Sequence, residues 1–299
     1  MTFEPHPSHI KAGQIAARVL KEASQEILPG TKVFKICTNA EKLIIKYGAR
    51  PAFPCTVSIN HFTAHYTSPV GDQTIIPQTG LVKLDVGAQI DGYLSDTAMT
   101  IDLDGTLEGF VAATDDALEE AIKMMQPGAS LGEVGEKIEK IIKTYGLKPI
   151  KNLSGHDMKR YRLHGGKSVP NVNKRDAGIV ELGECYAIEP YATNGAGTVI
   201  DSDLVFVFQK TGKDESIEGN SEKLRIHLRE KYGPYPFASR WIGTASKEMN
   251  LVESFRELLK FKAIRGIPVQ ISRKGRPVSQ SEHTIFISEE GPIVLTKRD

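Results

Sequence analysis

Apolar residues recur at helical spacing in two pairs of segments, one near the start of the chain and one near its middle. This spacing predicts helices over 9–27, 38–47, 115–126 and 130–145. Side chains suited to helix capping precede the last three of them: Thr38 or Asn39, Asp115 or Asp116, and Ser130. Strand-like alternation follows each pair, so the chain is predicted to be a mixed α/β (α+β) protein.

The two helix pairs resemble each other at a fixed spacing of 98 residues. Pro29-Gly30 and Tyr47-Gly48 in the first pair correspond to Pro127-Gly128 and Tyr145-Gly146 in the second. The ungapped match indicates an internal duplication. Two related αβ halves would place their sheets together with the helices outside, and the crevice between the halves is the natural place for chemistry.

The pattern changes after residue 205. Lys210–Asn220 is polar and predicts a loop, and 221–233 and 245–262 predict two helices before strand-like sequence returns. We interpret 210–268 as an inserted, mainly helical subdomain within a single domain that spans 1–299.

Composition narrows the function further. The chain has 299 residues with 40% hydrophobic and 25% charged residues, and its formal net charge is +1. A chain this neutral offers no electrostatic reason to bind nucleic acid or a membrane surface. No apolar run is long enough to span a bilayer, and the first residues lack the apolar core of a signal peptide. Cys37, Cys55 and Cys185 form neither a disulfide framework nor a zinc-finger spacing, so we expect a cytoplasmic protein.

The segment 81–102 holds the first candidate site. Its alternation predicts two strands joined by a type I′ turn at Asp91-Gly92, with Asp85 and Asp96 on either side of the turn. Depending on the register, the two aspartates are direct cross-strand partners or diagonal neighbours, about 5–8 Å apart on one face. Like charges this close are unfavourable unless a cation lies between them, and a divalent cation is the simplest one.

Three later segments offer further candidates. His156 and His164 lie in GHDMKRYRLHGG, Glu189 ends a strand just before a proline, and Glu282 opens an apolar strand. Each of these alone could be a surface residue or a structural histidine. Together with the two aspartates they supply Asp, Asp, His, Glu and Glu, which suits a pair of divalent first-row ions better than a cysteine-rich zinc site. Two such ions bridged by carboxylates make a hydrolytic centre.

With these residues the sequence resembles the type II methionine aminopeptidases in their short archaeal form (peptidase family M24). The resemblance covers nearly the whole chain and is carried by AHY at 64–66, LDVGAQIDGYLSDTA at 84–98, SGHDMKRYRLHGGKSVPN at 154–171, YAIEPYATNGAG at 186–197 and SEHTI at 281–285. It implies the pita-bread (creatinase/aminopeptidase) fold, whose pseudo-twofold halves agree with the repeat. The insertion before SEHTI is the feature that separates type II from type I.

The resemblance also implies a role for each site residue. The ligands of two divalent ions (Co, Mn, Fe or Zn) would be Asp85, Asp96, His156, Glu189 and Glu282. Asp96 and Glu282 would be shared between the ions, and Glu189 would also act as general base and acid. His65 and His164 would hydrogen-bond the scissile peptide. Phe53 and Leu163 would be walls of the methionine pocket.

The implied reaction is removal of the initiator methionine from nascent polypeptides whose second residue is small, by an enzyme that we expect to be a monomer. The family often has an aromatic residue in a Tyr-Pro segment before the last ligand. Here the stretch reads Gly266-Ile267-Pro268-Val269, which leaves one pocket wall in doubt.

Two alternatives stay open. A proline-specific peptidase (prolidase or aminopeptidase P) shares the fold and a similar ligand set, although only about 80 residues precede Asp85, too few for the N-terminal domain such enzymes usually carry. A non-catalytic binding protein on the same fold would have lost ligands, whereas all five ligand types are present. A dinucleotide site is not indicated, because no GxGxxG follows a strand and opens a helix.

Overall fold

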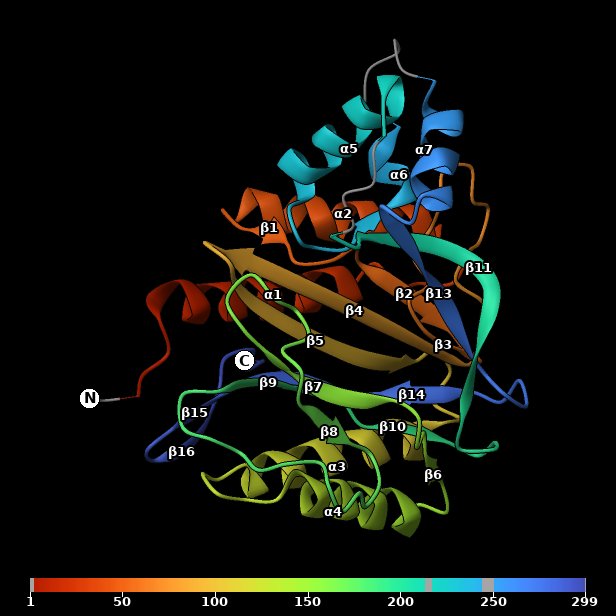
Figure 1. Ribbon diagram of the computed structural model, residues 1–299. Coiled ribbons are helices and arrows are strands. Elements are labelled where there is room, and N and C mark those ends of the chain that lie inside the picture. The colour runs from red at the N-terminus through yellow and green to blue at the C-terminus, as the bar shows by residue number, and fades with distance from the viewer. Residues whose placement is uncertain (1–2, 213–216, 244–249, 299) are drawn as a thin grey trace.

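The computed structural model describes residues 3–212, 217–243 and 250–298. Two αβ halves lie against each other with their sheets inside and their helices outside (Figure 1). The elements of the first half are α1 (Pro7–Ser24), α2 (Val33–Lys46), β1 (Arg50–Pro51), β2 (Thr56–Ile59), β3 (Phe62–Ala64), β4 (Leu81–Ile90) and β5 (Tyr93–Asp102). This arrangement of two αβ halves confirms the predicted mixed α/β (α+β) class and the pita-bread fold.

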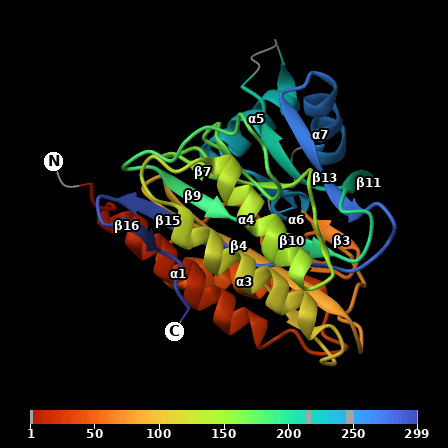
Figure 2. The same cartoon turned by 90° about the horizontal axis from the view of Figure 1, so that it is seen from below.

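The second half follows the same plan and takes its last strands from the end of the chain. Its elements are α3 (Glu108–Met124), α4 (Leu131–Thr144), β6 (Lys148–Pro149), β7 (Ser154–Met158), β8 (Ser168–Pro170), β9 (Cys185–Ile188), β10 (Tyr191–Thr193), β14 (Val278–Gln280), β15 (His283–Ser288) and β16 (Gly291–Val294). Helices α3 and α4 cover the outer face of this half, as the view from below shows (Figure 2).

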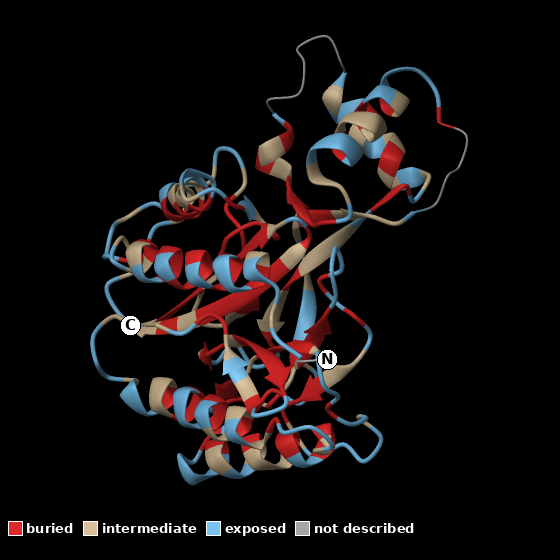
Figure 3. Cartoon of the chain, turned by 90° about the vertical axis from the view of Figure 1, so that its left-hand side faces the viewer, coloured by how far each residue is buried: buried red, intermediate tan, exposed pale blue. Residues whose placement is uncertain are grey.

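The remaining elements lie between β10 and β14 in the chain. They are β11 (Val199–Lys210), α5 (Gly219–Tyr232), β12 (Phe237–Ala238), α6 (Ser239–Ile242), α7 (Leu251–Lys260) and β13 (Ile264–Ser272). Their helices project from the body of the molecule (Figure 3) and pack around an apolar cluster that includes Leu224, Leu228, Phe237 and Leu258. Strands β11 and β13 pair with each other and continue to β3 of the first half, so the projecting helices rest on a sheet shared with the body.

The internal repeat is visible in backbone detail. The N–H of Gly30 donates to the carbonyl oxygen of Ile76, and the N–H of Gly128, 98 positions later, donates to that of Val180, each at 2.8 Å. The two glycines have nearly the same φ, 86° and 85°. Strands β1 and β6 also begin and end at positions that differ by 98. The matching bonds support the duplication inferred from the sequence.

Two predicted helix starts were wrong. Helix α2 begins at Val33 rather than at 38, because Val33, Ile36 and Cys37 are buried against the sheet and extend the apolar stripe backwards. Thr38 therefore lies inside the helix, where its hydroxyl donates to the carbonyl oxygen of Phe34 at 2.7 Å instead of capping.

Helix α3 likewise begins at Glu108 rather than at 115. A side-chain oxygen of Asp102 accepts from the N–H of Leu107 at the N-terminus, so a residue outside the expected window anchors the helix start. Helix α1 ends at Ser24 instead of 27. Of the helix predicted over 245–262, α7 covers 251–260, and 245–249 lie outside the described residues.

The two halves have separate apolar cores. Helices α1 and α2 pack on the first sheet around residues such as Leu20, Ile36, Leu84 and Val86. Helices α3 and α4 pack on the second sheet around an equivalent set, including Leu131, Ile138 and Ile285. The outer helix faces are exposed and the faces toward the sheets are buried (Figure 3). None of the described helices is both long and apolar enough to cross a bilayer.

Candidate metal centre and catalytic cavity

A cavity of about 280 Å³ lies where strands of the two halves and of the β11–β13 sheet meet. All nine residues that the sequence singled out line it: Phe53, His65, Asp85, Asp96, His156, Leu163, His164, Glu189 and Glu282. They come from segments that are up to 229 positions apart, between Phe53 and Glu282. The fold therefore brings every predicted site residue to one place.

The β4–β5 hairpin positions the two aspartates. Asp91 and Gly92 both have positive φ, 52° and 86°, as the predicted type I′ turn requires. Asp85 lies opposite Ala98 and Asp96 opposite Gly87, so the aspartates are diagonal neighbours rather than direct partners. Diagonal neighbours on one face remain within reach of each other's side chains.

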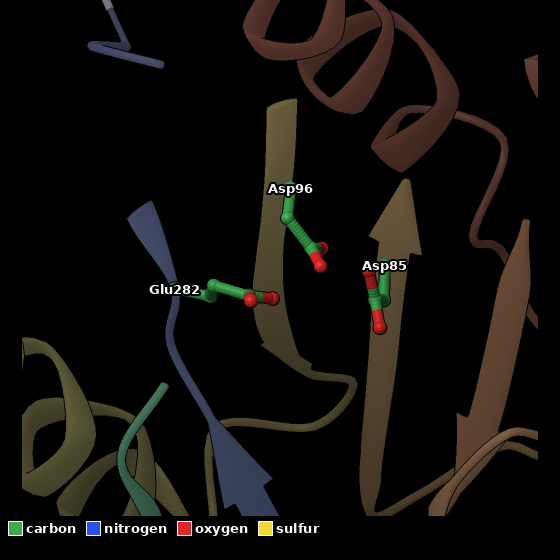
Figure 4. Close-up of side chains that lie close together, drawn as sticks. All are labelled: Asp85, Asp96 and Glu282. Atoms are coloured by element: carbon green, nitrogen blue, oxygen red, sulfur yellow. The ribbon is translucent and has the colours of Figure 1, made fainter. Parts of the chain in front are cut away.

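Glu282, just before β15, completes a cluster of three carboxylates. Asp85, Asp96 and Glu282 each offer a carboxylate oxygen, and these oxygens all lie within 4.8 Å of one another. Figure 4 shows the three side chains pointing toward a common centre from β4, from β5 and from the segment before β15. This separation allows one cation to contact several of the oxygens.

His156 and Glu189 stand next to this cluster. The Nε2 atom of His156 on β7 lies 3.6 Å from Asp96 Oδ2 and 3.8 Å from Glu189 Oε1. Strands β7 and β9 are paired, which holds His156 close to Glu189 at the end of β9. The hydroxyl of Tyr191 donates to Glu189 Oε2 at 2.7 Å and fixes the orientation of that carboxylate.

Hydrogen bonds across the crevice hold the carboxylate strands in place. The hydroxyl of Thr97 donates to the carbonyl oxygen of Glu282 at 2.8 Å, and the N–H of Glu282 donates to Ala98 at 3.0 Å. The N–H of Asp96 donates to the hydroxyl of Thr284 at 2.7 Å. The backbones that carry Asp96 and Glu282 are thus joined directly, so the two halves cannot separate without disturbing the cluster.

The electrostatics of the cluster call for a cation. Burial, and the repulsion between neighbouring carboxylates, raise the pKa values of Asp85, Glu189 and Glu282 well above the usual range. Burial raises the pKa of Asp96 to about 7. In the described part of the chain, no lysine or arginine nitrogen lies within 4 Å of these four carboxylates.

A buried oxygen without a hydrogen-bond partner also indicates that the cluster binds a cation. Asp85 Oδ1 is buried and accepts no hydrogen bond, and such an atom is costly unless a ligand satisfies it. Burial lowers the pKa of the His156 imidazole to about 4, so the ring is neutral and its nitrogen is free to act as a ligand. Four carboxylates and one imidazole are a suitable donor set for divalent ions.

His65 and His164 line the cavity beside the candidate ligands. His65 Nδ1 lies 3.1 Å from the carbonyl oxygen of Pro268, which can only accept, so Nδ1 carries the proton and Nε2 is left as an acceptor. The His164 ring lies 4.2 Å from the His156 ring, centroid to centroid. Burial lowers the pKa of both rings, to about 3 for His164, so both are neutral at pH 7.

Phe53 and Leu163 belong to one apolar cluster beside the cavity, together with Ala52, Leu94, Met158, Cys185, Ala187 and Tyr235. The Phe53 ring packs on the backbone of Gly87, where a Cβ atom would lie 2.2 Å from Phe53 Cε1. Glycine at position 87 is therefore needed for the ring to occupy this place. The wall that the sequence left in doubt is formed by Gly266, Ile267 and Pro268 of β13.

Sequence reasoning missed several residues of the site. Tyr191, which holds Glu189, could have been found because it lies two positions further along and so returns to the same side of the chain. Pro236, Gln209 and Arg265 also line the cavity. They come from the β11–β13 region, and no local motif in the sequence connected them with the ligands.

Several known proteins resemble this chain in sequence. Residues 8–210 match the model of metallopeptidase family M24. The chain is 39% identical to a methionine aminopeptidase of Methanothermobacter thermautotrophicus over 97% of this chain and 98% of that protein. It is 40% identical to a methionine aminopeptidase of Methanocaldococcus jannaschii over 99% of this chain and 100% of that protein.

Solved structures share the fold. A thermophilic Arx1 superposes with a TM-score of 0.84 at 22% identity, covering 96% of this chain and 89% of that one. The methionine aminopeptidase of Thermotoga maritima superposes over the full length of both chains with a TM-score of 0.71 at 24% identity. The prolidase of Pyrococcus furiosus reaches 0.61 at 19% identity, and its match covers 63% of that chain. At these identities the likeness concerns the fold alone.

The name of the family implies that its members use a metal ion, and the carboxylate cluster provides ligands for one. The family match covers most of the chain, and the two relatives match it almost from end to end. The cavity, the donor set and these similarities together show that the chain is an aminopeptidase of metallopeptidase family M24, within which it belongs to the methionine aminopeptidases.

Proposed function

We propose that this protein removes the N-terminal methionine from nascent polypeptides and peptides whose second residue is small, and that it uses two divalent ions to do so. Asp85 would hold one ion, His156 and Glu189 would hold the other, and Asp96 and Glu282 would contribute ligand atoms to both. The position of Asp96 supports this division, because it belongs to the carboxylate cluster and also lies 3.6 Å from His156.

When bound, a pair of divalent ions polarises the scissile carbonyl and lowers the pKa of the attacking water. Glu189 accepts the proton of that water and passes it to the amine nitrogen that leaves. The hydrogen bond from Tyr191 keeps one oxygen of Glu189 in a fixed orientation, so the other oxygen faces His156 and the reacting atoms. His65, with Nε2 as an acceptor, receives a hydrogen bond from a peptide N–H of the substrate.

The apolar cluster around Phe53 and Leu163 supplies a pocket for the methionine side chain. Methionine is flexible and unbranched, and it fills an irregular apolar space well. A charged first residue would lose its hydration without gaining a partner there and is expected to be rejected. The second side chain lies near His65 and His164, where bulk would displace the carbonyl, and a misplacement of about 1 Å can cost on the order of 10²-fold in rate.

The observation that carries this proposal is the convergence of the five candidate ligands and two neutral histidines beside one apolar pocket. The test is a series of Met-X-Ser peptides, with X from Gly to Trp, assayed with each of Co, Mn, Fe and Zn. We expect cleavage for small X, sharply lower rates for large X, and about two ions per chain by elemental analysis. A flat profile across X would refute the selection of a small second residue.

Prolidases share the fold, so the same assay includes X-Pro peptides with a first residue other than methionine. Faster cleavage of these peptides than of Met-Ala-Ser would move the protein to the proline-specific class. A matched pair of variants tests the histidines. His65→Ala and His164→Ala should keep their metal but lose about 10²–10³ in kcat, whereas loss of metal in either variant would make that residue a ligand.

A further inference from the structure

Arg265 is placed at the point where the catalytic cavity opens to solvent. It lies on β13 opposite Gln209 of β11, and both side chains line the cavity. Arg265 is exposed although it also lines the cavity, which locates it at the rim rather than on the floor. We use the term mouth for Gln209 and Arg265.

No acidic neighbour in the described part of the chain balances the charge of Arg265. Its Nη2 donates to Oε1 of the neutral Gln209 at 2.9 Å. Among the described residues, none of the carboxylates forms an ion pair with it. A guanidinium has five N–H donors in a planar fork that suits a carboxylate, so most of its donors remain available to a ligand.

Arg265 is also the single lysine or arginine among the described residues that line the cavity. Arg265 shares the lining of the cavity with His164. The four carboxylates of the floor would be offset by the two divalent ions of the proposed function, and the histidines are neutral. The mouth is then the place where the cavity carries net charge, and that charge is positive.

The route of the substrate places its later residues near this charge. The methionine side chain occupies the apolar pocket, and the scissile peptide lies between the ligands and His164. The chain that continues beyond the second residue must leave through the open end of the cavity, where Arg265 lies.

We propose that Arg265 recognises an acidic side chain at the third position of the substrate and disfavours a basic one there. This inference rests on the proposed function and adds a determinant of specificity to it. Arg265 would bind substrate without taking part in bond cleavage, so its effect should appear mainly in KM and should weaken as salt screens the interaction.

The experiment compares Met-Ala-Xaa-Gly peptides, where Xaa is Glu, Gln or Lys, with amidated C-termini so that the terminal carboxylate does not compete. At low ionic strength we expect kcat/KM for the Glu peptide to exceed that for the Lys peptide by about 2- to 5-fold, the upper part of the range for an exposed charge pair. Arg265→Gln should bring this ratio close to one, and Arg265→Lys should retain part of it. Arg256→Gln removes an exposed positive charge from α7, away from the cavity, and should leave the ratio unchanged.

The outcomes separate this inference from the proposed function. A Glu-to-Lys ratio near one in the unaltered protein, with Met-Ala peptides still cleaved, would overturn the role of Arg265 alone. A ratio that survives Arg265→Gln, or one that Arg256→Gln abolishes equally, would do the same. If the metal-loaded protein cleaves none of the Met-Ala peptides, the proposed function fails and this inference fails with it.

Discussion

Glu41 and the four candidate ligand carboxylates are all acidic groups inside this protein, but their surroundings differ. Glu41 on α2 is paired with Arg240 on α6, and it also accepts from the indole N–H of Trp241 at 2.8 Å and from the N–H of Cys55 at 3.1 Å. The catalytic cluster has no such cation among the described residues, and Asp85 Oδ1 has no partner at all.

The comparison shows two ways of offsetting the free energy that a carboxylate loses when it is removed from water. Burial raises the pKa of Glu41 although Arg240 opposes this, so desolvation disfavours the charged form even of a paired carboxylate. The chain supplies the compensating charge itself at Glu41, where the pair ties the projecting helices to α2. At the proposed metal site the charge of Arg298 opposes the rise in the pKa of Glu282, but no described lysine or arginine is paired with the cluster, so most of the compensation is left to a cation from outside. The contribution of the Glu41–Arg240 pair to the free energy of unfolding should therefore be independent of metal. The contribution of the carboxylate cluster should depend on it.

The largest effect is expected from Asp96→Asn. Removal of a shared ligand should abolish turnover, by more than about 10²-fold, and should reduce the bound metal. In the metal-free state the same change relieves repulsion within the carboxylate cluster, so Asp96→Asn should then be at least as stable as the unaltered protein. Steady-state kinetics, metal analysis and urea unfolding with and without chelator check these points.

Two tightly bound ions and normal turnover in Asp96→Asn would show that Asp96 is not a shared ligand. A large loss of stability in the metal-free variant would show instead that the cluster is held together without a cation.

Arg240→Met is the matching change at the other site. It leaves Glu41 buried without its cation and should destabilise the protein by about 3–5 kcal/mol, with or without metal. Adding Glu41→Gln should recover part of this loss, because the uncompensated charge is removed. Equal stability of the single and double variants in urea unfolding would argue against a buried ion pair at this position.

A variant of His9 tests whether the stability of the protein also depends on pH at a position away from Glu41 and from the carboxylate cluster. Burial lowers its pKa to about 4, and its Nε2 lies 2.7 Å from the carbonyl oxygen of Leu94. Because the unfolded chain binds this proton more readily than the folded one, stability should fall as pH drops from 6.5 toward 4, by on the order of 3 kcal/mol. In metal-free protein, His9→Gln should show a smaller fall over this range. An unchanged pH profile would mean that other groups cause the loss.

The smallest expected effect is a pH dependence of metal affinity, because a proton on Asp96 competes with the metal. With the pKa of Asp96 raised to about 7 in the metal-free protein, a bound ion must displace a proton below that pH. Metal affinity should therefore fall roughly tenfold per pH unit below 7 for each proton displaced. Calorimetry in buffers of different ionisation enthalpy measures the protons released. No proton release at pH 6 would contradict the raised pKa.

Much of the site could be predicted from short segments of sequence. The turn at Asp91-Gly92 is a local signal, because only a few residue types accept positive φ at both positions, and it brought Asp85 and Asp96 together. A two-residue turn at these positions pairs Ile90 with Tyr93 and so places Asp85 opposite Ala98, which is the diagonal arrangement that the structure has. The roles of the individual residues, as ligands, base or pocket walls, stay predictions that the experiments above address.

The helix boundaries were less predictable. The starts of α2 and α3 depend on packing against the sheets and, for α3, on Asp102, which lies outside the helix. A capping residue such as Thr38 is equally able to bond within a helix, so its presence does not fix the start.

The sequence by itself predicted the two related halves and the residue types of the candidate metal site, because these depend on periodicity and on turn chemistry that act over a few neighbours. Only the tertiary structure decided that Arg240 compensates Glu41 and that Arg265 lies at the mouth. These contacts join separate strands and helices, some nearly 200 residues apart. Their energies depend on burial and on which charge is left without a partner, and both arise only once the chain has folded.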